Sequence, residues 1–136
     1  MKNKILFLCT GNSCRSQMGE ALFNHYRKDS GTAFSAGIEK HGLNPYMLKV
    51  LKELNIDTTK LYSKALEELP NNDFDLIITV CGHAHENCPY FPGKTIHHGF
   101  DDPPFLTKEY QDEEEILQVF RRVRDEIKAF ILKLEI

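Results

Sequence analysis

The sequence predicts a three-layer α/β sandwich built around a four-stranded parallel sheet. Short apolar runs alternate along the chain with segments of helical periodicity, which is the pattern of parallel strands joined by crossover helices. The 136 residues, of which 41% are hydrophobic, are enough for one core without disulfide support. We therefore expect a single domain over residues 1–136.

The first half of the chain contains two predicted strands and two predicted helices. Residues 5–9 form a continuous apolar run, typical of a strand buried on both faces. Apolar residues then recur at helical spacing over residues 15–28, and residues 32–36 form a short second strand. Residues 44–45 are Asn-Pro, which predicts a helix start with Asn as the cap and Pro in the first turn.

The second half contains the clearest strand and the longest helix. Residues 74–81 are almost entirely apolar and β-branched, and residues 94–98 form a weaker fourth strand. The acidic residues 112–115 stand where a helix begins, and they offset the positive end of its dipole. One side of this last helix is lined by apolar residues, namely Ile116, Val119, Phe120, Val123, Ile127, Phe130, Ile131 and Leu134.

This topology brings two cysteines to one edge of the sheet. Cys9 ends the first predicted strand and Cys81 ends the third. The carboxyl ends of parallel strands share one rim, and ligands bind at that rim where the strand order reverses. We therefore expect both thiols near a common ligand site.

Composition excludes several classes of function. The formal charge of −3 leaves no basic excess for nucleic acid or an anionic membrane surface. No apolar run approaches the roughly 18–20 residues of a membrane span, and no signal peptide is recognised, so we expect a cytoplasmic protein. In that compartment the four cysteines indicate thiol or metal chemistry rather than structural disulfides.

Residues 9–16 are the strongest chemical signal in the chain. They run Cys, five residues, Arg, Ser between a predicted strand and a predicted helix, so successive amides can converge on a tetrahedral anion at the helix N-terminus. Gly11 and Asn12 tolerate the positive φ values that such a loop needs, and Arg15 can bind two oxygens of the anion. The residues expected to bind the oxyanion are Thr10, Gly11, Asn12, Ser13, Cys14, Arg15 and Ser16.

The same loop favours a nucleophile at Cys9. The guanidinium and the helix N-terminus favour the thiolate form, and the Ser16 hydroxyl is in range to donate a hydrogen bond to the sulfur. An oxyanion bound in the loop would then lie directly over this sulfur. We interpret Cys14, by contrast, as a packing residue.

Residues 9–16 resemble the signature of the low-molecular-weight protein tyrosine phosphatase superfamily. The longer run 9–18 is more similar to the thioredoxin-coupled arsenate reductases within it, and the similarity continues through residues 35–39, 41–45 and 99–103. The resemblance implies a flavodoxin-like fold and an enzyme that reduces arsenate to arsenite. No cofactor is implied, and nothing in the sequence demands more than a monomer.

The resemblance also implies a three-cysteine cascade. Cys9 forms an adduct with arsenate, Cys81 attacks the Cys9 sulfur and releases arsenite, and Cys88 then attacks Cys81. Thioredoxin reduces the final disulfide between Cys81 and Cys88. Each transfer is thiol–disulfide exchange, and residues 81–88 include Gly and Ala, which suits a segment that must both extend and close.

Asp102 is the candidate general acid. In the superfamily an Asp-Pro pair supplies the acid for the leaving group, and Asp102 matches that position ahead of Asp101. The phosphatase branch usually continues with two tyrosines, whereas this chain has Pro104 and Phe105.

Two other functions remain open at this stage. The first is hydrolysis of phosphate monoesters by Cys9, Arg15 and Asp102 alone. The second is a metal-binding or metalloid-sensing module without turnover. Its ligands would lie among the cysteines and histidines of residues 81–88, although their spacing is not that of a structural zinc site, and we assign no metal ligand.

A cation site near the loop is doubtful. Some reductases of this type are similar to one another in a potassium site matching Asn12, Glu20 and Ser35 here, completed by an Asp. This chain has Lys64 at the position of that Asp. A lysine ammonium would take the place of the cation, so we expect no potassium binding.

Overall fold

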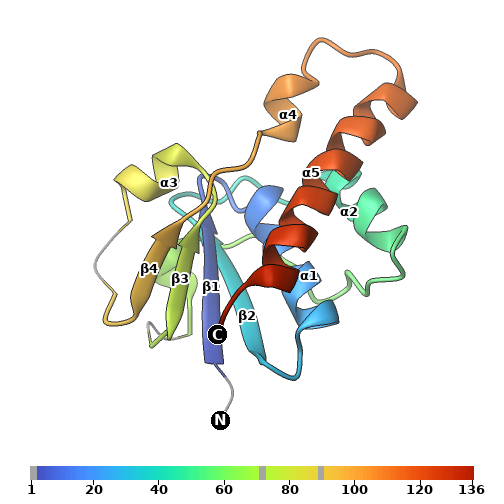
Figure 1. Ribbon diagram of the computed structural model, residues 1–136. Helices are drawn as coiled ribbons and strands as arrows, with labels where there is room; N and C mark the ends of the chain where they lie inside the picture. The colour runs from blue at the N-terminus through green and yellow to red at the C-terminus, as the bar shows by residue number, and fades with distance from the viewer. Residues whose placement is uncertain (1–2, 71–72, 89–90) are drawn as a thin grey trace.

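A computed structural model describes residues 3–70, 73–88 and 91–136. At its centre is a sheet of four parallel strands in the order β2-β1-β3-β4 (Figure 1). The α/β fold predicted from the alternation of strands and helices is confirmed. The strands are β1 (Asn3–Cys9), β2 (Gly31–Gly37), β3 (Leu76–Thr79) and β4 (Lys94–His97).

Strand β1 occupies the middle of the sheet because its apolar run can be buried on both faces. It pairs with β2 on one side, from Asn3 opposite Gly31 to Cys9 opposite Gly37, and with β3 on the other side. The strand order therefore reverses between β1 and β3, and the loops leaving these two strands diverge at their carboxyl ends. Cys9 and Cys81 both lie at this edge, as the topology predicted.

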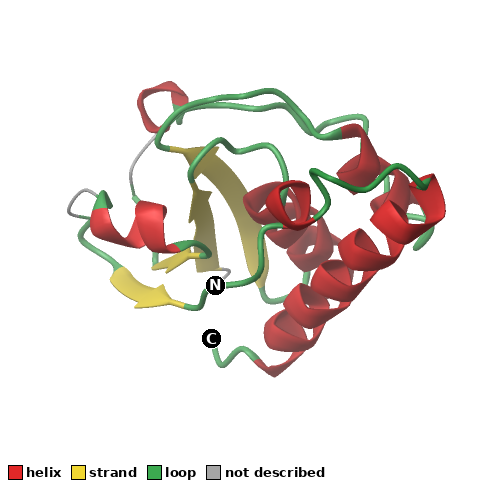
Figure 2. Cartoon of the chain, turned by 90° about the horizontal axis from the view of Figure 1, so that it is seen from above, coloured by secondary structure: helices red, strands yellow, loops and turns green. Residues whose placement is uncertain are grey.

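Three longer helices pack together, with α1 on the sheet and α5 against α1 and α2, and two of them begin at a side-chain cap, of which the Asn44 cap was predicted. Helix α5 lies beside α1 and α2 in both views (Figures 1 and 2). The Asn44 side chain accepts hydrogen bonds from the amides of Tyr46 and Met47 at 2.9 and 3.1 Å, and Asp112 caps the last helix similarly. These helices are α1 (Arg15–Tyr26), α2 (Pro45–Lys52) and α5 (Glu113–Lys133).

A buried arginine joins α2 to α5. The Arg124 guanidinium donates to the Val50 carbonyl and to Glu53 Oε1, both at 2.9 Å. Arg121, which is more exposed, also bonds Glu53 and holds the pKa of that carboxyl below its ordinary value. These contacts hold the middle of α5 against the end of α2.

Three short helices escape prediction because none is long enough to show helical periodicity. They matter because two of them flank the site: α3 directly follows Cys81, and α4 directly follows Asp102. The three are η1 (Leu66–Glu68), α3 (Gly82–Glu86) and α4 (Pro103–Leu106).

Close packing explains a glycine in the middle of α1. Glycine costs a helix about 1 kcal/mol relative to alanine. A Cβ added at Gly19, however, would lie 2.5 Å from the Phe7 ring of β1, and both residues are buried. Gly19 therefore lets α1 approach the sheet.

Gly19→Ala is expected to destabilise the fold by about 1–3 kcal/mol, because overpacking outweighs the gain in helix propensity. Chemical denaturation measures the difference. Gly82→Ala is the matched control, since it is also helical but a Cβ there meets nothing within 4 Å. A Gly19→Ala protein at least as stable as the parent would contradict the packing argument.

No helix in the described ranges combines the length and the apolar character that a membrane span requires.

Candidate active site

The loop after β1 is held from outside by its carbonyl groups. The segment that continues β2 donates its amides to the carbonyls of Cys9, Thr10 and Gly11 at 2.9–3.1 Å. Asn44 likewise donates its amide to the Ser13 carbonyl at 3.0 Å. In a trans peptide the N–H points opposite to the C=O. The amides that follow these carbonyls are therefore directed to the other side of the loop, as an anion-binding nest requires.

Asn12 locks the loop from its buried interior. Its φ of 50° is the left-handed value predicted for this position. The side-chain oxygen accepts from the Lys64 amide and from Gln17 Nε2, both at 2.8 Å. The side-chain nitrogen donates to the Ser16 hydroxyl at 2.8 Å. This network fixes the curl of the loop without using its own amides.

The Cys9 sulfur lies 2.8 Å from the Ser16 hydroxyl, so the predicted contact between them is confirmed. Because the Ser16 oxygen already accepts from Asn12, its own hydrogen is available to donate to the sulfur. Cys9 is buried at the end of β1. The arrangement can stabilise a thiolate at this position.

A cavity of about 290 Å³ opens over this sulfur. Arg15 lines it and is held by a bond from Nη1 to the Phe100 carbonyl at 3.0 Å. Asp102 lies across the cavity, with a carboxylate oxygen 3.6 Å from Arg15 Nη2. Pro104 forms part of the wall, whereas Phe105 is 61% exposed and is not among the lining residues. The predicted nucleophile, guanidinium and carboxylate thus share one pocket.

One expectation about the loop is wrong, and its correction reveals a residue that the sequence did not single out. Gly11 does not adopt a positive φ. A Cβ at this position would collide with His41 Nδ1, so the glycine lets the imidazole of His41 lie against the loop. His41 also lines the cavity, and its Nε2 is 2.8 Å from Glu39 Oε2. In the sequence, Gly11 hinted at this contact only indirectly, because a glycine can also mark a place where another side chain packs closely on the backbone.

Cys81 reaches the rim of the same loop. It caps α3, and its sulfur accepts a bond from the Ala84 amide at 3.4 Å. The Thr10 hydroxyl lies 3.3 Å from that sulfur. A second thiol is therefore positioned by the oxyanion loop itself.

Cys88 lies beyond the other end of α3 and is partly buried against the core. Burial raises the pKa of its thiol. No disulfide joins any of the four cysteines. The segment between Cys81 and Cys88 contains the short helix α3, which the sequence analysis did not predict.

Cys14 differs chemically from the other thiols. Burial raises its pKa well above the ordinary value, and the neighbouring Cys9 adds to this effect while Arg15 opposes it. A neutral buried thiol is a poor nucleophile. This agrees with the packing role expected for Cys14.

A buried ammonium lies beneath the loop. The Lys64 side chain is 5% exposed, and its Nζ is 3.7 Å from Glu20 Oε1 and 3.2 Å from the Tyr62 carbonyl. Ser35 donates to the same Glu20 oxygen at 2.7 Å. Burial lowers the pKa of Lys64, and the Glu20 carboxylate opposes that shift. The Lys64 ammonium therefore lies beside Glu20, in the place where the family resemblance suggested a cation site.

Replacing sodium chloride by potassium chloride at equal ionic strength is therefore expected to leave the Tm unchanged, as differential scanning fluorimetry can measure. Lys64→Met keeps most of the stem but removes the charge, and it should cost about 2 kcal/mol because Glu20 loses its partner. A potassium-specific rise in the Tm of the parent protein would contradict this interpretation.

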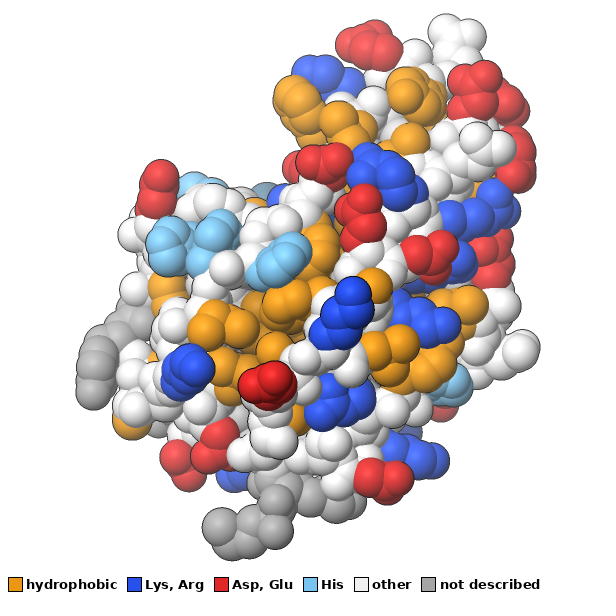
Figure 3. Space-filling view, viewed as in Figure 1, with side chains coloured by type: hydrophobic (Ala, Val, Ile, Leu, Met, Phe, Trp, Pro, Cys, Tyr) orange, Lys and Arg blue, Asp and Glu red, His pale blue; other side chains and the backbone are white. Residues whose placement is uncertain are grey.

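Histidines gather over α3 and β4 on the face shown in Figure 3. The rings of His85 and His97 are tilted by 34° against each other with centroids 4.4 Å apart, and His97 Nδ1 is 2.8 Å from the Thr79 hydroxyl. Within residues 3–70, 73–88 and 91–136, no group of three or more His, Cys, Asp or Glu side chains is arranged to hold a metal ion. The zinc interpretation therefore has no ligand cluster there.

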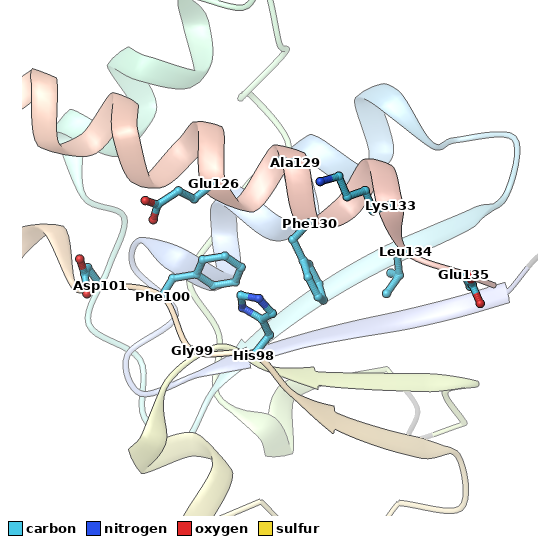
Figure 4. A pocket seen from close by; sticks show the side chains of 10 residues that line it. All are labelled: His98, Gly99, Phe100, Asp101, Glu126, Ala129, Phe130, Lys133, Leu134 and Glu135. Carbon is cyan, nitrogen blue, oxygen red and sulfur yellow. The ribbon is translucent and has the colours of Figure 1, made fainter.

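A larger hollow of about 570 Å³ lies between the end of β4 and α5 (Figure 4). The rings of His98, Phe100 and Phe130 turn toward one another at its base, with centroids 4.6–5.8 Å apart. It contains neither a thiol nor the oxyanion loop. Size alone therefore does not select the candidate site, because the predicted site residues line the smaller cavity over Cys9.

Comparison with known proteins agrees with this geometry. The family model of low molecular weight phosphotyrosine protein phosphatases matches residues 4–135. An arsenate reductase of Bacillus subtilis is 48% identical over 130 residues, which cover 93% of this chain and 91% of that relative.

Solved structures share the architecture. An arsenate reductase in its oxidized state superposes with a TM-score of 0.76 at 26% identity, covering 97% of this chain and 95% of the other. The low molecular weight protein tyrosine phosphatase of T. tengcongensis gives the same TM-score and identity, with 97% of each chain covered. The fold therefore accommodates both chemistries, and the side chains must distinguish them.

Proposed function

The chain belongs to the low molecular weight phosphotyrosine protein phosphatase family, and on that premise we propose that it reduces arsenate to arsenite through Cys9, Cys81 and Cys88. We propose a single domain over residues 1–136 that acts as a monomer in the cytoplasm, where thiols are kept reduced. Thioredoxin is the proposed electron donor, and the chain itself needs no cofactor.

One observation carries this proposal beyond oxyanion binding. The Cys81 sulfur lies 3.3 Å from the hydroxyl of Thr10, the residue that follows Cys9 in the loop. Hydrolysis of a phosphate ester needs no second thiol at that place. Reduction needs one, because converting As(V) to As(III) takes two electrons and a disulfide is the two-electron product of two thiols.

In the first step, the loop amides and Arg15 bind arsenate over Cys9. The thiolate, hydrogen-bonded by Ser16, attacks arsenic and forms a sulfur–arsenic bond. One hydroxyl of the hydrogen arsenate ion leaves as water after receiving a proton from Asp102, which lines the cavity. Arsenic remains As(V) at this stage.

In the second step, the Cys81 thiolate attacks the Cys9 sulfur. The electron pair of the sulfur–arsenic bond passes to arsenic, which leaves as arsenite, and a disulfide between Cys9 and Cys81 remains. The Ala84 amide and the Thr10 hydroxyl both contact the attacking sulfur, so both can stabilise its thiolate.

In the third step, Cys88 attacks Cys81 and restores the Cys9 thiolate. The five residues of helix α3 (Gly82–Glu86) lie between the two cysteines and rise by roughly 7.5 Å, whereas a disulfide requires Cα atoms about 5.5 Å apart. Helix α3 must therefore unwind for this bond to form. The resulting Cys81–Cys88 disulfide lies on a short segment that a dithiol protein can reach.

Phosphate ester hydrolysis is the second candidate. Its support is the position of Asp102 opposite Arg15 in the same cavity, which suits an acid for a leaving alcohol. The absence of tyrosines at positions 104 and 105 removes the aromatic walls typical of the phosphatase branch.

Mass spectrometry after one round with arsenate tests the proposal. The reduced chain, mixed with one equivalent of arsenate and quenched with an alkylating reagent, should contain a Cys81–Cys88 disulfide, with Cys9 and Cys14 alkylated. Release of arsenite measured in the same sample should match the disulfide formed. A chain with all four thiols alkylated and no arsenite would refute the cascade.

A further inference from the structure

We propose that His41 is an additional substrate-contacting residue, whose protonated imidazole donates Nδ1–H to the bound oxyanion while Glu39 binds the opposite ring nitrogen. This inference rests on the proposed function only in taking a tetrahedral oxyanion as the ligand. It does not depend on the transfer of electrons between thiols.

Backbone contacts position His41 at the cavity. Its amide donates to the Gly11 carbonyl at 2.9 Å, and its ring is packed so closely on Gly11 that a Cβ there would collide with Nδ1. The residue lines the same cavity as Cys9 and Arg15. The imidazole is therefore fixed against the anion-binding loop by short-range contacts.

Glu39 determines which nitrogen is available. Its carboxylate is 2.8 Å from His41 Nε2, and its own amide donates to the Thr10 carbonyl at 2.9 Å. With Nε2–H donating to Glu39, Nδ1 is the nitrogen left on the Gly11 side. This nitrogen donates only when the ring is protonated.

The charges around the cavity favour that protonation when an anion is bound. Arg15 from α1 is the one cation among the other lining residues, whereas Cys9 from β1, Cys14 before α1 and Asp102 before α4 are the acidic groups. The charged neighbours on the segment of His41 itself are Glu39 and Lys40, and Lys40 is paired with Glu68 at 3.0 Å. A dianion in this pocket therefore attracts a proton to His41, whose side chain is 51% exposed and exchanges protons with solvent.

The sign of the pH dependence follows from this linkage. If the bound anion accepts Nδ1–H, binding takes up a proton on His41, so sulfate affinity falls as the pH rises. A charge-assisted hydrogen bond corresponds to an effect of about tenfold in affinity.

Sulfate is the probe because its charge does not change between about pH 5 and pH 8. Isothermal titration calorimetry would compare three full-length proteins in a Cys9→Ser background, which removes the thiol beneath the bound anion. These are the background itself, the addition of His41→Gln, and the addition of His25→Gln as a control on α1. The background and the His25→Gln protein should lose about tenfold in sulfate affinity across the range. The His41→Gln protein should show a flat, weak profile.

Nitrogen-15 NMR of the imidazole gives a direct second measurement. Sulfate added to the background protein near neutral pH should shift the His41 ring resonances to those of the doubly protonated form. Three results would each overturn the inference: the same pH profile in the His41→Gln protein as in the Cys9→Ser protein, His41 ring resonances that do not shift when sulfate is added, or no sulfate binding by the Cys9→Ser protein. A chain that binds sulfate in this way but makes no arsenite would refute the proposed function and leave this inference standing.

Discussion

The Cys81→Ser and Cys88→Ser variants are expected to lose steady-state arsenate reduction by roughly 1,000-fold or more, since each breaks a sequence of transfers that works only as a unit. Neither Cys81 nor Cys88 is among the residues that line the cavity over Cys9. Hydrolysis of an aryl phosphate, if the chain supports it, should therefore persist in both variants and be lost only in Cys9→Ser.

Single-turnover measurements should separate the two relay positions. The Cys88→Ser variant can still form the Cys9–Cys81 disulfide, so it should release one arsenite per chain and then stop. The Cys81→Ser variant should release none. Reduction at the parental rate in either variant, measured with thioredoxin and its reductase as the electron supply, would contradict the cascade.

Arg15→Lys is expected to lower kcat/KM for arsenate by about 100–1,000-fold. The guanidinium bonds the Phe100 carbonyl through one nitrogen while its other nitrogen faces the cavity. Lysine keeps the charge but cannot be anchored by one nitrogen and bind two anion oxygens at the same time. The measurement is steady-state arsenite production at subsaturating arsenate.

Arg27→Lys is the matched control for this substitution. Arg27 donates to the carbonyls of Ile131 and Leu134 at the end of α5, away from the cavity. This variant should lose some stability and retain kcat/KM. Equal losses of activity in the two variants would show that the effect of Arg15→Lys is structural rather than one of anion binding.

The sequence predicts those structural elements whose formation depends on residues close together along the chain. Strand β1 and helix α5 are predicted because each carries an unbroken apolar pattern, and Asn44 and Asp112 mark their helices through short-range capping. Helix α3 is not predicted, because it has five residues and its cap is a cysteine sulfur rather than an oxygen.

The same distinction applies to the site. Cys9 and Ser16 are seven positions apart in one motif, so their contact follows from the loop alone. His41, in contrast, is brought to the loop by a distant part of the chain, because the segment after β2 donates its amides to carbonyls on the outside of the loop. Lys64 reaches Glu20 through a long connection as well. Contacts of this kind join residues far apart in the sequence and depend on tertiary packing, so the spacing of residues within a motif does not predict them.

Helix α3 bears on which state of the protein an electron donor can recognise and reduce. In the resting chain Cys81 caps an intact helix, and under the proposed mechanism that helix is lost only after arsenite has departed. The reduced protein and the protein with the Cys81–Cys88 disulfide then differ in conformation at the same surface. An electron donor that binds only the unwound conformation would reduce the oxidised protein and would not bind the reduced one.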